Sequence, residues 1–151
     1  MAEIAVKEIP DQLALTAKRR VSLATVAEGM HEAFGAIMAQ AGASGAQFTG
    51  PPFCLYPGEM GDEFDMVVCL PVAPGAAAGG GVDLETVAGG RVATTMHHGP
   101  YSALGETYGA LQAWMAANGH TPSGPVREVY LTDPQTVPAD ELVTEIDWPV
   151  S

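Results

Sequence analysis

Basic residues, cysteines and long apolar runs are all scarce in this 151-residue chain. Six Lys and Arg stand against 18 Asp and Glu, which gives a formal net charge of −12. A surface this negative repels the phosphate backbone that dominates nucleic-acid affinity, and it equally repels an anionic membrane. No apolar run approaches the roughly 18 residues that a membrane span needs. We therefore expect neither nucleic acid nor membrane as a partner.

Cysteine and histidine are too few to build a metal centre or a disulfide framework. Cys54 and Cys69 are the only cysteines, and no Cys or His cluster has zinc-site spacing. His97 and His98 are adjacent, so in a strand their side chains would point to opposite faces. The chain also lacks a P-loop, a G-x-G-x-x-G fingerprint and a G-x-S-x-G nucleophile elbow. We predict two buried thiols, no metal and no cofactor.

Charged residues make up 16% of the chain and hydrophobic residues 47%, a composition too apolar for intrinsic disorder. The first residues, 1–4, lack the basic region and the apolar stretch of a secretory signal. A chain of this length can bury a sizeable core within one domain. We expect a single cytoplasmic, soluble domain over residues 1–151.

A flexible stretch rich in glycine and alanine, residues 74–81, divides the chain into two similar halves, residues 1–73 and 82–151. Helix-ending glycines and Gly-Pro turns recur in the two halves at nearly constant offsets. Such self-similarity indicates that one supersecondary unit was used twice. We expect residues 74–81 to be an exposed, mobile linker, because glycine and alanine offer it little to bury.

Each half is predicted to run strand, strand, helix, strand, strand. Apolar residues recur at helical spacing within 24–41 and 101–118. Strands are predicted over residues 3–9, 13–20, 52–57, 64–71, 82–88, 91–97, 126–132 and 141–148. Two helices among eight strands are too few for a parallel, doubly wound sheet. We therefore predict an α+β fold of duplicated β-α-β-β modules, with antiparallel sheets and two main helices around a central cleft.

One carboxylate stands among apolar and aromatic neighbours. Alternation along residues 126–131 places Glu128 and Tyr130 on the same strand face. In the repeat alignment Glu128 corresponds to Cys54 and Tyr130 to Tyr56, so only one half carries a charge there. This asymmetry favours a site for a single polar feature of an apolar ligand. The alternative is that Glu128 is a solvated strand residue paired with a neighbouring Lys or Arg.

A second set of carboxylates lies on the last predicted strand. Glu141, Glu145 and Asp147 share one face of that strand. Three like charges would not be buried together, so we interpret this row as a solvated face.

Two stretches together resemble the GyrI-like small-molecule-binding family. They are residues 91–101 (RVATTMHHGPY) and residues 128–134 (EVYLTDP), with Trp114 near the end of the helix between them. The resemblance covers essentially the whole chain. It implies two SHS2-type β-α-β-β modules around a cleft, as in the effector-binding domains of multidrug-responsive MerR-type and AraC-type regulators. It also covers free-standing proteins without a DNA-binding domain, which is what we expect here.

The resemblance implies roles for three residues. Glu128 matches the family's glutamate that faces lipophilic cations in an aromatic pocket, Tyr130 matches its partner tyrosine, and Tyr101 matches the tyrosine of the G-P-Y motif. Further ligand-binding candidates follow from strand and helix position, because Met and aromatic side chains suit promiscuous apolar ligands. These are Phe53, Tyr56, Met66, Tyr108 and Trp114.

Three functions are compatible with these residues. The leading hypothesis is a stand-alone protein that captures a hydrophobic aromatic or cationic compound, with a regulator as a possible partner. The alternative, implied by some relatives, is a hydrolase that opens the cyclopropane ring of DNA-alkylating natural products. Glu128 would then activate a water, and Tyr130 or Tyr101 would donate to the developing oxyanion. A third hypothesis, based mostly on the net charge, is a protein–protein inhibitor of gyrase.

Overall fold

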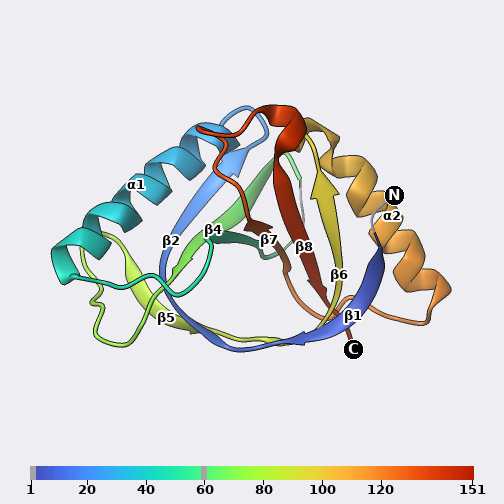
Figure 1. Ribbon diagram of the computed structural model, residues 1–151, viewed down its shortest axis with the longest axis horizontal. Helices are drawn as coiled ribbons and strands as arrows, with labels where there is room; N and C mark the ends of the chain where they lie inside the picture. Colours follow the sequence, from blue (N-terminus) through green and yellow to red (C-terminus); the bar gives the residue numbers. More distant parts are fainter. Residues whose placement is uncertain (1–2, 59–60) are drawn as a thin grey trace. The chain divides into compact units, whose positions relative to one another are not determined.

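The computed structural model describes residues 3–58 and 61–151 (Figure 1). Over this part of the chain the order strand, strand, helix, strand, strand occurs twice, as predicted. The elements are β1 (Ile4–Ile9), β2 (Gln12–Ser22), α1 (Val26–Ser44), β3 (Phe53–Tyr56), β4 (Glu63–Pro71), β5 (Asp83–Val87), β6 (Gly90–His98), α2 (Leu104–Ala117), β7 (Val126–Tyr130) and β8 (Val143–Pro149). Short 3-10 turns occupy Tyr101–Ala103 and Ala139–Glu141. The α+β class with antiparallel strands and two main helices is confirmed.

The chain divides into two compact units. The α1 unit, Pro10–Gly89, holds the strand order β3-β4-β2-β5 together with helix α1. The α2 unit, Met1–Ile9 with Gly90–Ser151, holds the order β1-β6-β8-β7 together with helix α2. Within each unit the neighbouring strands are antiparallel. Within the described residues, each unit therefore contains four strands and one long helix.

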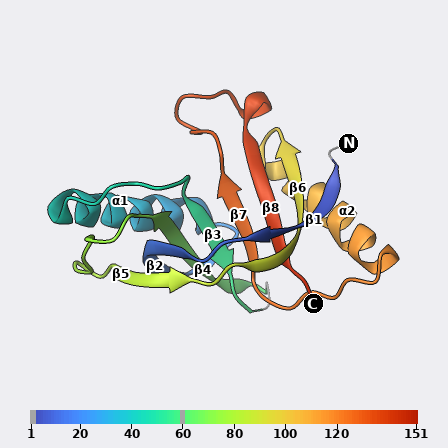
Figure 2. The ribbon, with the colours of Figure 1, turned by 60° about the horizontal axis from the view of Figure 1, so that its bottom comes forward.

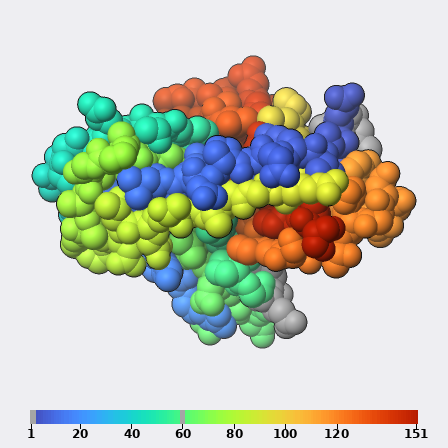
Figure 3. All heavy atoms as spheres, turned by 90° about the horizontal axis from the view of Figure 1, so that it is seen from below, coloured from blue at the N-terminus to red at the C-terminus, as the bar shows by residue number. Residues whose placement is uncertain are grey.

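The two units are not the sequence halves 1–73 and 82–151. Strand β1 pairs with β6, from Ile4 opposite Thr95 to Ile9 opposite Gly90, and β5 pairs with β2 (Figure 2). In a space-filling view the blue atoms of β1 lie along the yellow atoms of β6 (Figure 3). Strand β1, from the first sequence half, thus belongs to the sheet of the α2 unit. Strand β5, from the second sequence half, belongs to the sheet of the α1 unit. Alternation reveals that a segment is a strand, but it does not say which open edge that strand covers.

Helix α1 packs on β2 and β4 through residues one turn apart, Ala33, Ile37 and Ala41, all of which are buried. Gly29 permits the close approach at the start of this helix, since a Cβ there would lie 2.6 Å from Cγ1 of Val21. The helix continues to Ser44, three residues beyond its predicted end. It ends at Gly45, whose φ of 67° is the left-handed conformation that suits glycine.

Helix α2 covers the sheet of its own unit. Leu111 and Met115 from the helix are buried against Ala93, Ile146 and Val150. Leu111 and Met115 are one helical turn apart, so they lie on one face of α2, and that face packs on strands β6 and β8. Side chains of β7 and β8 on the same side of the sheet therefore lie under the helix. Across the described part of the chain, neither helix combines the length and apolar character that a membrane crossing requires.

The stretch 74–81 is mostly exposed, as expected, but it is tied to the α1 unit. The side-chain amide of Gln40 on α1 donates to the carbonyl of Ala77 at 2.8 Å. Gly79 and Val82 exchange two backbone hydrogen bonds of 2.9 and 3.0 Å. Ala76 is buried, contrary to the expectation that this stretch has nothing to bury. Its predicted mobility stays a prediction.

Candidate functional site

The carboxylate of Glu128 is buried on β7, with 7% of the residue exposed. The hydroxyl of Tyr108, on α2, donates to its Oε2. The hydroxyl of Tyr130, two residues along the strand, donates to its Oε1 at 2.8 Å. Among the ion pairs of residues 3–58 and 61–151, none involves Glu128. The alternative of a solvated residue paired with Lys or Arg is therefore wrong.

Aromatic rings surround this carboxylate within the α2 unit. The ring of Tyr101 meets that of Tyr130 edge to face, with centroids 5.9 Å apart. The rings of Tyr108 and Trp148 meet in the same way at 6.1 Å. Edge-to-face pairs of this kind are favourable arrangements of the ring quadrupoles. They hold in place the two phenols that donate to Glu128.

Tyr101 is the most accessible member of this group, with 36% of the residue exposed. Partial burial raises the pKa of its phenol, and the negative charges of Glu128 and Asp133 raise that pKa further. The phenol therefore stays protonated at neutral pH, and it can donate a hydrogen bond to a group that enters beside it.

The loop that carries Tyr101 is held by His97, which is buried at the end of β6. Its Nε2 lies 2.9 Å from the carbonyl of Pro100, and its Nδ1 lies 2.6 Å from the hydroxyl of Thr107. A carbonyl can only accept, so Nε2 donates to it, and in the neutral imidazole Nδ1 then accepts from the hydroxyl. Our sequence reasoning missed this role of His97, although the residue stands two positions before the G-P-Y motif.

Thr144 on β8 lies opposite both Tyr130 and His97 in the strand register. It is fully buried, and its hydroxyl lacks a hydrogen-bond partner among the residues that the structure describes. Tyr130 and its register partner Thr144 point to the same sheet face, and so does Glu128 by alternation. A buried hydroxyl without a hydrogen-bond partner is rare in proteins. Thr144, Tyr130 and Glu128 together make this sheet face more polar than an ordinary hydrophobic core.

The remaining candidates are distributed between the two units. Trp114 is in the α2 unit, but its ring stacks on that of His120 at 5.5 Å and packs against the hydrophobic core. Tyr56 and Met66 are buried in the α1 unit, where Tyr56 meets Phe64 at 6.0 Å between centroids. Phe53 is also buried there, and alternation along β3 turns it to the sheet face opposite Tyr56. The structure thus brings Tyr101, Tyr108 and Tyr130 together with Glu128.

A second carboxyl group is buried on the other face of this sheet. Asp147 on β8 is 2% exposed and accepts a hydrogen bond from the hydroxyl of Thr94 at 2.6 Å. Burial raises its pKa to about 7, and the neighbouring Glu145 contributes to that rise. Glu145 is paired with the ammonium of Lys7 at 3.2 Å. The prediction that Glu141, Glu145 and Asp147 form a solvated face is therefore wrong for Asp147. A shared proton and hydrogen bonds reduce the free-energy cost of burying this carboxyl group.

Metal-ligating side chains do not converge anywhere in residues 3–58 and 61–151, where no group of three or more His, Cys, Asp or Glu could hold an ion. Cys54 and Cys69 are both buried, as predicted. The candidate site itself presents one carboxylate and three phenols.

Comparisons with known structures agree with this fold. The C-terminal domain of EcmrR has a TM-score of 0.89 at 24% identity, and the match covers 100% of this chain and 98% of that one. A hydrolase from Listeria innocua has a TM-score of 0.74 at 16% identity, covering 99% and 92%. A structure with bound tetraphenylphosphonium has a TM-score of 0.69 at 13% identity, covering 99% and 94%. No curated protein matches the sequence.

A family model with the description GyrI-like small molecule binding domain matches residues 2–151. The chain therefore belongs to this family, and the resemblance noted in the sequence is confirmed.

Proposed function

We propose that the protein captures a hydrophobic, cationic aromatic compound at Glu128. The observation that carries this proposal is a buried carboxylate whose hydrogen-bond partners in the described residues are two neutral phenols, Tyr108 and Tyr130. Phenols stabilise a carboxylate without neutralising it. A charge held in a low-dielectric setting attracts a delocalised cation more strongly than it would in water.

The surrounding rings support the same ligand class. Tyr101, Tyr130 and Trp148 present aromatic surface close to the negative charge, and a cation over such a ring gains attraction from the ring quadrupole. The exposed part of Tyr101 gives a ligand a point of entry. A lipophilic cation is thus favoured over a hydrated ion such as ammonium, because it loses little hydration when it is buried.

The proposal is tested with two ions of the same shape and opposite charge. Tetraphenylphosphonium is bound in one structural neighbour, and tetraphenylborate is its anionic counterpart. We expect calorimetry to show preference for the phosphonium. Glu128→Gln should lower phosphonium affinity about tenfold or more, which corresponds to loss of about 1.4 kcal/mol. Glu141→Gln removes one exposed carboxylate from the same unit and should leave the affinity unchanged. Equal affinity for both ions, or an unchanged Glu128→Gln variant, would contradict the proposal.

A second candidate function is the hydrolase. It is favoured by the three phenols beside one carboxylate, and a neighbour of this fold is described as a hydrolase. In that reaction a water oxygen bonds to a carbon of a strained cyclopropane as one ring bond breaks. The bonding electrons move to a conjugated oxygen, which takes a proton from a tyrosine such as Tyr101 or Tyr130. Glu128 accepts the proton of the attacking water and passes it back to the tyrosine.

Turnover distinguishes the two functions. The protein at substoichiometric concentration is incubated with a cyclopropane-bearing alkylating compound in oxygen-18 water, and ring-opened product is measured by mass spectrometry. A hydrolase gives many labelled products per protein, and Glu128→Gln abolishes them. A binding protein instead protects the compound in a one-to-one ratio, because it need only match the ground state. The hypothesis of a gyrase inhibitor still rests mostly on the net charge.

A further inference from the structure

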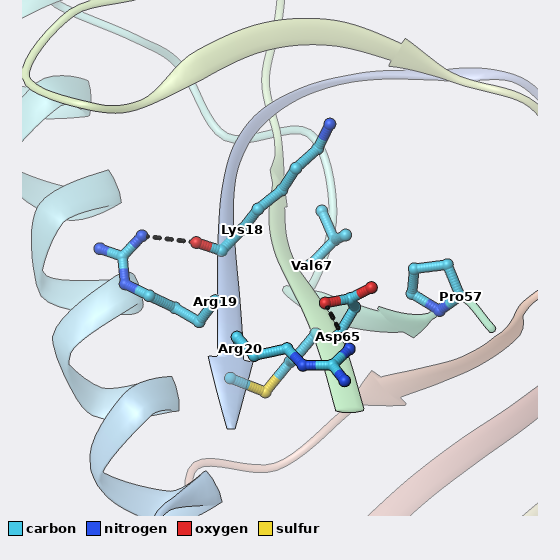
Figure 4. A pocket seen from close by; sticks show the side chains of 7 residues that line it. Lys18, Arg19, Arg20, Pro57, Asp65 and Val67 are labelled. Atoms are coloured by element: carbon cyan, nitrogen blue, oxygen red, sulfur yellow. Dashed lines mark hydrogen bonds and ion pairs between the residues drawn. The ribbon is translucent and has the colours of Figure 1, made fainter. Parts of the chain in front are cut away.

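A pocket of about 390 Å³ opens in the α1 unit (Figure 4), and Glu128 is not among its lining residues. Residues 18–20 of β2, residues 65–67 of β4 and Pro57 after β3 line it. Strand register pairs Lys18 with Val67 and Arg20 with Asp65, so these four side chains share one sheet face. Arg19 turns to the other side, where its guanidinium lies 3.4 Å from Glu32 of α1.

Positive charge is concentrated at this pocket. The chain has six Lys and Arg in all, and three of them are consecutive here, in a protein whose net charge is −12. The exposed Lys18 ammonium forms no ion pair within residues 3–58 and 61–151. Arg19 is paired with Glu32 and Arg20 with Asp65, so the net positive charge at the pocket comes from Lys18.

Arg20 contributes donors as well as charge. Its Nη1 lies 3.1 Å from Oδ1 of Asp65, which is a contact through one nitrogen (Figure 4). A guanidinium carries five N–H donors, so the others can meet a second acceptor. With Lys18, Arg20 and Asp65 together, this face of the pocket carries a net charge of about +1 at neutral pH.

The wall beside these charges is apolar. Val67, which is largely buried, and the ring of Pro57 both line the pocket (Figure 4). A ligand that fits must therefore combine one negative group with an apolar body. Asp65 disfavours a second negative charge, since like charges in one pocket repel.

We propose that this pocket is a second binding site, for an organic monoanion such as an aromatic carboxylate, held by Lys18 and Arg20 with its ring against Val67 and Pro57. The site has the opposite charge preference to the Glu128 group, and it does not depend on the function proposed there. The protein would then bind two chemical classes at separate places.

The test uses 2-naphthoate, with 2-naphthamide as its neutral match and 2,6-naphthalenedicarboxylate as its dianion. Calorimetry should give the tightest binding for the monoanion at moderate salt. The NMR methyl signals of Val67 should shift when 2-naphthoate is added. Lys18→Met should weaken naphthoate binding by roughly threefold to fivefold, the effect of a partly exposed ion pair. Lys18→Arg should preserve it.

Two variants serve as controls. Arg91→Met removes one exposed positive charge from the α2 unit and should leave naphthoate affinity unchanged. Glu128→Gln should also leave it unchanged, which separates this site from the first one. The proposal is overturned if the amide or the dianion binds as tightly as the monoanion, or if naphthoate does not bind at millimolar concentration. It is also overturned if Lys18→Met has no effect or if the Val67 signals do not move.

Discussion

The phenol of Tyr108 on α2 donates its hydrogen bond to the carboxylate of Glu128 on β7, twenty residues further along the chain. This bond connects the helix of the α2 unit to a strand beneath it. The same carboxylate receives a second bond from Tyr130, so both of its oxygens are satisfied. A buried charge can be retained at this position because each oxygen has a donor.

Tyr108→Phe should destabilise the fold, because it leaves Oε2 of Glu128 without this donor while it preserves the ring contact with Trp148. We expect the free energy of unfolding to fall by about 1 to 3 kcal/mol. Urea denaturation of the single variants and of the Tyr108→Phe, Glu128→Gln double variant measures this. The two effects should be less than additive, since both act on one hydrogen bond. Strict additivity would show that the bond contributes nothing.

Sequence patterns predicted the elements of this fold closely, because strands and helices leave different periodicities. Glu128 was also predicted as a site residue, on the contrast between a carboxylate and its apolar strand face. The contact with Tyr108 was not predictable in the same way. It depends on how α2 packs across the sheet, which the spacing of apolar residues does not specify.

Other features were missed for related reasons. Alternation alone led us to assign Asp147 to a solvated face, whereas its burial depends on Thr94 and Glu145 supplying hydrogen bonds. Trp148 was assigned only to a strand, because its contact with Tyr108 exists only after packing. The partners of β1 and β5 were missed since a strand pattern contains no information about its neighbour.

His97→Phe should loosen the loop before α2, because it removes the bonds to Pro100 and Thr107 together. We expect faster hydrogen exchange at the amides of residues 101–104 and a loss of about 1 to 3 kcal/mol in stability. His98→Phe is the matched control, since the neighbouring His98 is exposed. If the two variants exchange at the same rates, His97 does not hold this loop.

Gly29→Ala should destabilise the α1 unit, because the new Cβ would lie 2.6 Å from Cγ1 of Val21. Overpacking of this kind costs about 1 to 3 kcal/mol. Gly35→Ala, in the same helix with open space around it, should instead stabilise by about 0.5 to 1 kcal/mol. Thermal denaturation compares them, and the double variant Gly29→Ala, Val21→Ala relieves the contact. A stabilising Gly29→Ala would mean that the helix shifts freely on its sheet.

Asp147 should make stability fall as the pH rises. Its pKa is raised from an ordinary value of 3.8 to about 7 in the folded protein, through burial and the nearby Glu145. The folded state therefore holds a proton that the unfolded chain releases at lower pH. The resulting stabilisation is complete below about pH 4 and is lost progressively as the pH approaches 7.

The Asp147→Asn variant has no carboxyl group to titrate at this position, so its stability should lack this pH-dependent contribution. The difference in unfolding free energy between wild type and variant should therefore change between pH 4 and pH 8. Wild type should lose more stability over that interval than the variant does, as measured by urea denaturation at each pH. Lys7 opposes the shift through its charge, so Lys7→Met should increase the loss at high pH. Parallel stability curves for wild type and Asp147→Asn would show that the carboxyl group is already ionised throughout this range in the folded protein.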